Sequence, residues 1–295
     1  MTARRRLAGA LAALALLGAG CSSGDDGDPA AQDSPSASAS ASSAAPSPSA
    51  DASGSTDAAA APAVPRERAC YDLGYDAVLE PTSQAGPVAC SATHTSRTYA
   101  VGELDLVVDG HLLAVDSVAA QAQPAERCPG RLTEFLGGTT DDLRLSVFRP
   151  VWYSPTVEQS DAGADWFRCD VIALARDEEL APLAGRLEGV LARPDEAERW
   201  RVCGTAEPGA DDFERVACSE EHSWRALSVV DLADAGGDDG AYPGEDAVSS
   251  AGDGTCEDAA RDAAADPLNF RWGYEWPSAE QWEAGQRYGL CWAPA

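Results

Sequence analysis

The sequence contains no lysine, a single methionine and only three histidines among its 295 residues. All 21 basic residues are therefore arginine. They face 49 aspartates and glutamates, so the formal net charge is −28. Because nucleic acids and anionic lipid headgroups are polyanions, this charge disfavours both as partners, and we expect no nucleic-acid binding. The missing lysine, beside abundant alanine, aspartate and glycine, indicates a high-GC coding sequence rather than an adaptation.

The apolar run near the N-terminus is too short to span a membrane. Residues 7–20 would cover ~21 Å as a helix, whereas the hydrocarbon core of a bilayer is about 30 Å thick. Three arginines at positions 4–6 precede the run, and small residues end it. This pattern is typical of a secretory signal, so we predict a cleaved signal peptide over residues 1–20.

The residue after this signal is Cys21, and the preceding Leu-Leu-Gly-Ala-Gly resembles the lipobox of bacterial lipoproteins. Leu17 stands at minus four, and Gly18 takes the minus-three place where leucine is commoner. The resemblance implies that Cys21 is lipid-modified and holds the chain on the outer face of the cell membrane. The alternative is an ordinary secretory signal followed by an incidental, exposed thiol. Both place the rest of the chain outside the cytoplasm.

Residues 22–64 lack aromatic side chains, and Val64 is their only branched aliphatic residue. Serine, alanine, proline, glycine, aspartate and threonine make up nearly all of this stretch, which cannot bury enough apolar surface to fold. We predict that residues 21–64 form a lipid-anchored disordered linker. As a random coil it would have a mean end-to-end distance of about 35–40 Å.

Eight further cysteines form two copies of one pattern. Cys90, His94 and Cys128 recur at the same spacing as Cys218, His222 and Cys256. The segment 88–101 aligns without gaps with 216–229, and the segment 155–169 with 277–291. The offset stays fixed at 128 residues from Cys90 to Cys128, which indicates an internal duplication. We therefore divide the chain into module one (residues 65–176), a connecting segment (177–199) and module two (200–295).

An even number of cysteines in an oxidising compartment predicts a disulfide framework. The duplication favours bridges within modules, each copy joining its first cysteine to its second and its third to its fourth. The alternative is zinc, because Cys-x-x-x-His resembles part of a zinc site. Zinc sites usually carry closer cysteine pairs, so we expect no metal. The expected pairs are Cys70–Cys90, Cys128–Cys169, Cys203–Cys218 and Cys256–Cys291.

Module one combines predicted strands and helices in an α+β fold. Residues 97–106 and 143–148 alternate as strands do, and 166–175 form an apolar run typical of a buried strand. Residues 112–136 have a helical pattern that Pro124 and Pro129 should break or kink. A short helical turn should run from Pro155 to about Ala162. We expect two tandem, duplicated, disulfide-stapled modules with antiparallel sheet and short helices.

The connecting segment places leucines three and four residues apart, at positions 180, 183, 187 and 191. This spacing would give a helix one apolar face. The alternative is a tail that packs onto module one. In both cases the modules should lie close together.

Together these motifs resemble the septum formation family, a domain of lipoproteins from high-GC Gram-positive bacteria. The Cys-Ser-x-x-His elements (90–94 and 218–222) carry the resemblance, as do the Pro-to-Cys segments 155–169 and 277–291. Trp282 occupies the family's tryptophan position, where module one has Ser160. Arg97 and Arg225 stand where the family usually has an acidic residue. The resemblance implies a link to cell division and no particular reaction.

We assign no catalytic residue and no cofactor. The sequence contains none of the serine-hydrolase, zinc-protease or phosphate-binding motifs that would indicate a reaction. His94 and His222 are expected to be structural, with each ring bonded to backbone beside its disulfide. These two histidines, together with Trp276 and Trp282, are the candidate binding residues. We expect a binding or scaffolding protein whose partner is an envelope protein or glycan; the alternative is an envelope hydrolase with a His/Glu site.

Overall fold

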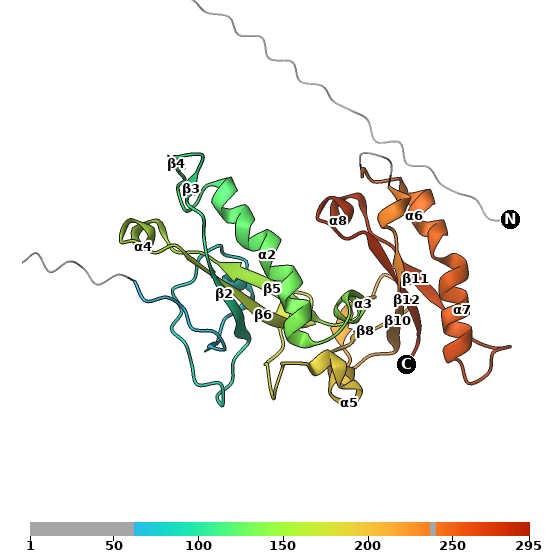
Figure 1. The fold of residues 1–295 in the computed structure, drawn as a ribbon. Coiled ribbons are helices and arrows are strands. Elements are labelled where there is room, and N and C mark those ends of the chain that lie inside the picture. Colours follow the sequence, from blue (N-terminus) through green and yellow to red (C-terminus); the bar gives the residue numbers. More distant parts are fainter. Residues whose placement is uncertain (1–61, 237–239) are drawn as a thin grey trace, which may run out of the picture. The chain divides into compact units, whose positions relative to one another are not determined.

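The computed structural model describes residues 62–236 and 240–295, so the predicted signal, Cys21 and nearly all of the linker lie outside the described residues. Two five-stranded antiparallel sheets form the frame of an α+β fold (Figure 1). The first contains, in spatial order, β1 (Cys70–Tyr71), β2 (Ser96–Glu103), β6 (Trp166–Arg176) and β5 (Phe148–Tyr153), with β7 (Glu179–Leu180) paired to β6. The second has the order β11 (Gly273–Glu275), β12 (Tyr288–Pro294), β10 (Trp224–Asp231), β8 (Val202–Gly204) and β9 (Arg215–Ala217). A separate hairpin joins β3 (Val107–Val108) to β4 (His111–Leu112).

One longer helix lies against each sheet: α2 (Val118–Leu136) on the first and α7 (Asp253–Ala263) on the second (Figure 1). Within the described residues, no helix combines the length and apolar character needed to cross a membrane. The remaining helices are short: α1 (Tyr75–Val78), α3 (Thr140–Arg144), α4 (Val157–Asp161), α5 (Pro194–Ala197), α6 (Glu245–Ala251), α8 (Ala279–Glu283) and the 3-10 turns η1 (Val190–Ala192), η2 (Glu198–Trp200) and η3 (Ala233–Ala235).

Four disulfides join the cysteines in the pairs expected from the sequence. Two of them fasten the long helices to their sheets: Cys128 of α2 to Cys169 of β6, and Cys256 of α7 to Cys291 of β12. Their Cα atoms lie 5.5 and 4.8 Å apart. The other two close shorter loops before β2 and β10, joining Cys70 to Cys90 and Cys203 to Cys218.

The two halves, residues 65–176 and 200–295, match in local detail. Strand β2 has an irregular register after Thr98 against β6, and β10 has one after Ala226 against β12, the equivalent residue in the alignment. Helices α4 and α8 each begin with a capping box, formed by Thr156 with Gln159 and by Ser278 with Gln281. Such boxes satisfy free backbone N–H groups at a helix start.

Two of the elements predicted for the first half differ in the structure. Helix α2 passes through Pro124 and Pro129 without a break, held by the Ser117 cap, the left-handed Gly137 and the Cys128–Cys169 bridge. The strand expected over residues 143–148 begins only at Phe148. Residues 143 and 144 belong to α3 instead, because Thr139 and Asp142 make a capping box that starts a helix there.

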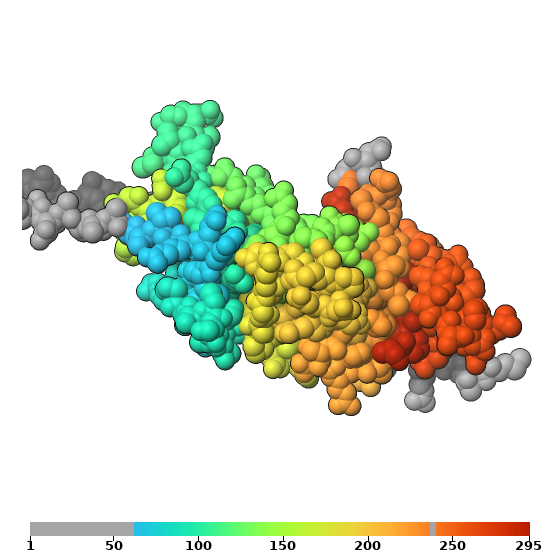
Figure 2. Space-filling view, turned by 60° about the horizontal axis from the view of Figure 1, so that its bottom comes forward, coloured from blue at the N-terminus to red at the C-terminus, as the bar shows by residue number. Residues whose placement is uncertain are grey.

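The helix expected over the connecting segment is wrong. Gly185 and Gly189 adopt positive φ angles of 78° and 71°, which end any regular helix between them. The leucines are nevertheless used, since Leu183 and Leu187 are buried in the main hydrophobic cluster. Residues 177–199, yellow in Figure 2, form a compact patch of surface. The alternative of a tail packed onto the first half therefore describes this segment better.

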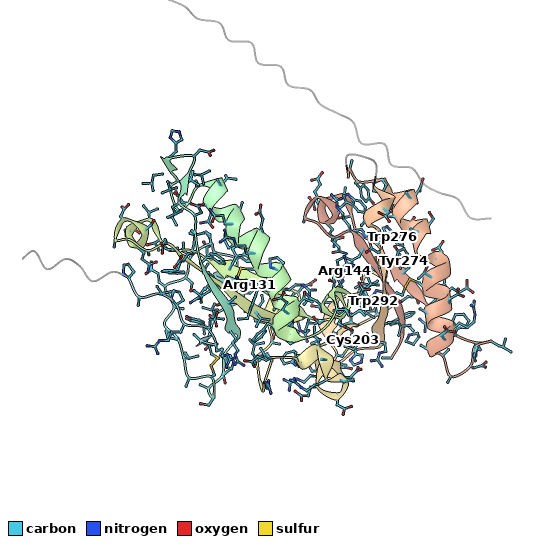
Figure 3. All side chains as sticks on the ribbon, in the orientation of Figure 1. Arg131, Arg144, Cys203, Tyr274, Trp276 and Trp292 are labelled. Atoms are coloured by element: carbon cyan, nitrogen blue, oxygen red, sulfur yellow. A yellow bond between two sulfur atoms is a disulfide. The ribbon has the colours of Figure 1, made fainter. Side chains whose placement is uncertain are left out.

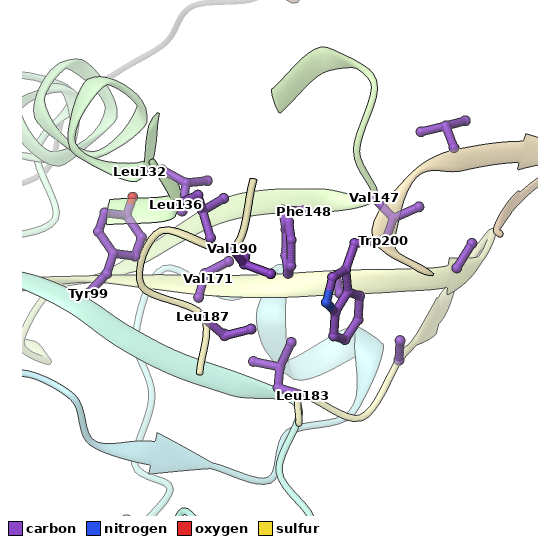
Figure 4. Packing of buried hydrophobic residues seen from close by; sticks show 14 of the residues in the cluster. Tyr99, Leu132, Leu136, Val147, Phe148, Val171, Leu183, Leu187, Val190 and Trp200 are labelled. Atoms are coloured by element: carbon purple, nitrogen blue, oxygen red, sulfur yellow. The ribbon is translucent and has the colours of Figure 1, made fainter. Parts of the chain in front are cut away.

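A single hydrophobic cluster spans both halves. Leu132, Phe148 and Val171 of the first half pack with Leu187 and with Trp200, which precedes the second sheet (Figure 4). The Phe148 and Trp200 rings lie 4.9 Å apart between centroids. The cluster continues into β10 and β12 through Trp224, Ala226, Leu290 and Trp292.

Arg144 at the end of α3 also joins the halves (Figure 3). Its guanidinium lies 4.6 Å from the centre of the Tyr288 ring and 3.7 Å from the Asp231 carboxylate. The face of the second sheet opposite α7 is therefore covered by the first half.

Candidate functional site

The two repeated histidines make the same backbone contact. His94 Nδ1 lies 2.9 Å from the Ala92 carbonyl oxygen, and His222 Nδ1 lies 2.8 Å from that of Glu220. His94 is buried, whereas His222 lines a cavity of about 320 Å³ with Glu221. No hydrogen bond joins either ring to a carboxylate in the described part of the chain. In this arrangement each ring stabilises the turn that follows its disulfide.

Across the described residues, Cys203, Cys218 and His222 form the only group of three potential metal ligands, with ligand atoms within 4.8 Å of one another. The two sulfurs are joined in a disulfide. Metal binding by cysteine requires the thiolate, so this group is not a zinc site in the oxidised state.

The two candidate tryptophans lie in different environments. Trp282 is 1% exposed, donates its indole N–H to the Gly240 carbonyl at 2.9 Å and belongs to the core of the second half. Trp276 is 37% exposed and lies beside Tyr274, with ring centroids 5.7 Å apart (Figure 3). Of the two, only Trp276 offers a surface for contact.

The least expected feature is a buried ion pair on strand β6. Arg168 and Asp170 are two residues apart and therefore on the same face of the sheet, the face opposite α2. They are 3% and 0% exposed. Arg168 Nε lies 3.3 Å from Asp170 Oδ2, and Asp170 also accepts hydrogen bonds from Ser96 at 2.9 Å and Thr98 at 2.7 Å.

The Arg168 guanidinium is fixed between two aromatic rings. It lies 3.7 Å from the centre of the Tyr71 ring and 4.5 Å from that of Tyr153. Its Nε faces Asp170 in the ion pair without the geometry of a hydrogen bond. Its Nη2 is buried without a hydrogen-bond partner among the described residues, as are the Tyr153 hydroxyl and the Trp166 indole N–H. Buried polar groups normally have such partners, so this concentration of unused donors is unusual.

Burial dominates the electrostatics of this cluster. It raises the pKa of Asp170, against the lowering effects of Arg168 and of the hydroxyls of Thr98 and Ser96. Burial also raises the pKa of the Tyr153 phenol well above its ordinary value, and the nearby Asp170 adds to this. The phenol therefore stays protonated at neutral pH and keeps its O–H as a donor.

Arg168 and Trp166 line a cavity of about 630 Å³, which we call the Arg168 pocket. Its other walls are residues 63–69, Tyr71, residues 83–85, Pro87 and Gln159. Charged lining residues are three arginines (Arg66, Arg68, Arg168) and one acid, Glu67. Arg168 is paired with Asp170, and Arg68 lies 3.6 Å from a carboxylate oxygen of Glu188, so the charges in and around the pocket are close to balanced.

The second half has no counterpart to this polar cluster. In the gap-free alignments Arg168 corresponds to Leu290, Asp170 to Trp292, Ser96 to Trp224 and Thr98 to Ala226, all buried. Tyr71 corresponds to Gly204, where an added Cβ would lie 2.6 Å from Phe213 and 3.3 Å from Trp292. This face of the second sheet packs on the first half, so it is apolar. The same face of the first sheet carries the Arg168 pocket, and the fold forms without such a cluster in the second half.

A larger cavity, of about 760 Å³, lies in the second half. Alanines and Phe270 make much of its lining, with Arg201, Arg225 and Arg271. These arginines already have partners: Arg271 pairs with Glu207 at 2.8 Å, Arg225 pairs with Glu198, and Arg201 donates to the Ala226 carbonyl at 3.3 Å. The Arg168 pocket is the stronger candidate, because Arg168 and Trp166 in its lining carry buried donors without a hydrogen bond among the described residues, whereas the lining of the larger cavity has none.

The Arg168 pocket was not predicted from the sequence, because residues 166–175 resemble a continuous apolar run. The signal was present: Arg168 and Asp170 alternate with buried residues, and Ser96 and Thr98 alternate in the same way on the neighbouring strand. Charged residues on the buried face of a strand require partners. Two charged residues and two hydroxyl-bearing residues on the buried faces of paired strands indicate a polar site.

Comparisons with known proteins agree with the resemblance found in the sequence. No curated protein and no solved structure matches the chain. A family model described as septum formation matches residues 69–291, a range that contains all four disulfides as well as Arg168 and Asp170. Such a domain suggests a role related to septum formation. The chain belongs to the septum formation family.

Proposed function

We propose that the protein is a lipid-anchored, extracytoplasmic binding protein of the cell envelope that contributes to septum formation by holding a ligand or partner. Cys21 carries the lipid, and residues 22–64 form the linker to the folded part. The partner is an envelope protein or glycan. The −28 net charge supports partners other than nucleic acid.

The Arg168 pocket is the observation that carries this proposal. Its volume is in the range of small-ligand sites, and Nη2 of Arg168 and the indole N–H of Trp166 have no hydrogen-bond partner in the described part of the chain. Arg168 and Asp170 are costly to bury, and the second half builds the same strands with apolar residues. A polar cluster that the fold does not require is best explained by a ligand.

We propose that the protein does not catalyse a reaction. A general base needs a nucleophile or an orienting partner within hydrogen-bond reach, and both histidine rings use Nδ1 on a backbone carbonyl. The exposed Glu158 and Glu280, one in each half, lie in the first turns of α4 and α8. Backbone and Thr156 hydrogen bonds lower the pKa of Glu158, which disfavours an acid role.

We also propose that the halves arose by duplication. Matching disulfides from helix to sheet, matching capping boxes and matching strand irregularities support this origin. After duplication, one half retained or acquired the polar pocket. The other half became the apolar support against which the first half packs.

The test is crosslinking in intact cells followed by purification from the membrane fraction. The wild type should retain one envelope component, and Arg168→Leu, which introduces the residue of the second half, should lose it. Arg261→Leu on α7 changes the net charge equally and lines none of the cavities described above, so it should behave as wild type. Cys21→Ser should abolish lipid labelling and release the protein from the membrane. Equal recovery of the component with Arg168→Leu would contradict the proposal.

A further inference from the structure

We propose that the Cys203–Cys218 disulfide is a reactive bond that a dithiol opens by thiol–disulfide exchange, with His222 moving the proton. The inference is independent of the Arg168 pocket. In this exchange the protein is the substrate, so the reaction is a modification of the chain rather than an activity of it.

The four disulfides differ in how far a reagent can reach them. The two bridges that join a helix to a sheet are closed off, because all four of their cysteines are fully buried. Each of the other two has one cysteine nearer the surface: Cys90 is exposed, and Cys218 is half-buried. Exchange requires access of a thiolate to a sulfur atom. Only Cys70–Cys90 and Cys203–Cys218 therefore meet this requirement.

The repeated histidine lies beside its disulfide in the second half alone. A ring nitrogen of His222 and the sulfurs of Cys203 and Cys218 lie within 4.8 Å of one another. Across the described residues, His94 forms no such group with its own disulfide. His94 is also 5% exposed and therefore closed to a reagent.

The cavity of about 320 Å³ gives a small reagent access to the His222 ring. Thr205 and Ser223 supply hydroxyl groups to its lining. The charges of Arg176 and Glu221, which also line it, offset each other. An uncharged dithiol therefore meets no net repulsion there.

The backbone contact of His222 fixes which ring nitrogen is available. A carbonyl oxygen only accepts, so the contact between Nδ1 and the Glu220 carbonyl places a proton on Nδ1. In the neutral ring the lone pair is then on Nε2. This nitrogen can accept the proton of an incoming thiol and return it to the sulfur that leaves. Stabilising the leaving thiolate accelerates exchange.

The burial of the two cysteines sets the direction of attack. Cys203 is 1% exposed, so the incoming thiolate attacks Cys218 Sγ and forms a mixed disulfide. The bond between the two protein sulfurs breaks, and Cys203 leaves with the electron pair and takes the proton from His222. The second thiol of the reagent then attacks its own mixed sulfur and releases Cys218. The dithiol is oxidised to a disulfide, and its two hydrogens end on Cys203 and Cys218.

Strand pairing keeps the two cysteines together after reduction. Strands β8 and β9 are paired from Val202 to Gly204, with Cys203 opposite Val216. The Cys218 N–H donates to the Arg201 carbonyl at 3.0 Å. These contacts do not need the bridge, so we expect the folded state to survive reduction and the bond to re-form with an added disulfide reagent.

The experiment treats the folded full chain with limiting dithiothreitol, traps free thiols with N-ethylmaleimide and maps them by peptide mass. Cys203–Cys218 should be reduced at least about tenfold faster than Cys70–Cys90, although Cys90 is the more exposed cysteine. Exposure alone predicts the opposite order. The comparison is made within the wild type, so it does not depend on the folding of any variant.

Two matched variants separate a chemical role of the histidine from a structural one. His222→Asn keeps a side-chain N–H near the Glu220 carbonyl but lacks the second ring nitrogen, so it should slow reduction of Cys203–Cys218 at least about tenfold. His94→Asn is the control and should leave the reduction rate of Cys70–Cys90 unchanged. A histidine that only stabilises its turn would tolerate asparagine without a change in rate.

The monothiol mercaptoethanol tests the direction of attack. Its trapped adduct should lie on Cys218, with Cys203 alkylated. Faster reduction of Cys70–Cys90, simultaneous reduction of all four bridges, an unchanged rate in His222→Asn or an adduct on Cys203 would each overturn the proposal.

Discussion

The Arg168 guanidinium lies 3.7 Å from the centre of the Tyr71 ring, although 97 residues separate them. Tyr71 belongs to the short edge strand β1. The Cys70–Cys90 disulfide closes the loop that follows this strand. The corresponding edge residue in the second half is Gly204, beside the apolar Trp292 and Phe213. At equivalent edge positions, the first half therefore has a tyrosine that contacts the Arg168 pocket, and the second half has a glycine against an apolar core.

Gly204→Ala should destabilise the protein by about 1–3 kcal/mol, because the added methyl group overpacks a filled core. The new Cβ would lie 2.6 Å from the Phe213 ring. Gly130→Ala in α2 is the matched control. No atom lies within 4 Å of its added Cβ, and the variant should gain up to about 1 kcal/mol of helix propensity. Urea unfolding of both variants checks this. A neutral Gly204→Ala would show that the apolar face is loosely packed.

Removing the bridge between α7 and β12 with Cys256→Ala and Cys291→Ala should cost about 3–4 kcal/mol, since the closed loop spans 35 residues. Both cysteines are fully buried, so the loss of sulfur contacts adds to the effect. The denaturation midpoint of the double variant, compared with that of the unreduced wild type, measures the change. An unchanged midpoint would mean that the Cys256–Cys291 disulfide does not contribute to stability and that α7 packs on the sheet equally well without it.

His94→Ala and His222→Ala should each lower stability by about 1 kcal/mol through loss of the bond to the backbone carbonyl. The effect should be larger at His94, which is the more buried of the two. Neither substitution should change envelope crosslinking. If His222→Ala retains its thermal transition but loses crosslinking, the histidine has a functional role and the hydrolase alternative gains support.

Alkaline pH should destabilise the fold through its buried tyrosines. Burial raises the pKa of Tyr274 to about 12, from an ordinary value of about 10. The folded state therefore favours the neutral phenol. This stability is complete below about pH 10 and is lost as the pH rises toward 12. Tyr274→Phe should reduce the steepness of that loss, measured by urea unfolding across this range. An identical pH profile in the variant would exclude Tyr274 as a contributor.

The sequence was most informative where residues constrain each other locally or repeat. The disulfide pairs, the buried strand β6 and the turn ending at Gly163 follow from spacing and capping. The connecting segment misled because leucine spacing suggested a helix, while Gly185 and Gly189 provide the turns that place those leucines in the core. For α2 the two prolines predicted a break, but tertiary contacts keep the helix continuous through both of them.

The Arg168 pocket was harder to predict because its parts come from distant segments. The strand order β1-β2-β6-β5 brings together Tyr71, Thr98, Tyr153 and Arg168. The spacing of residues along the sequence does not predict this order. Their pattern becomes visible when the two halves are aligned. In that alignment, polar residues of the first half correspond to buried apolar residues of the second half.

The most direct measurement of the central claim is site-specific photocrosslinking in intact cells. A photoreactive residue replaces Gln84 at the wall of the Arg168 pocket or, as a control, the exposed Glu283 on α8. We predict that the Gln84 position captures one envelope component, that added Arg168→Leu removes this product, and that Glu283 does not yield it. The same product from both positions, or from Gln84 irrespective of Arg168, would contradict a binding function at this pocket.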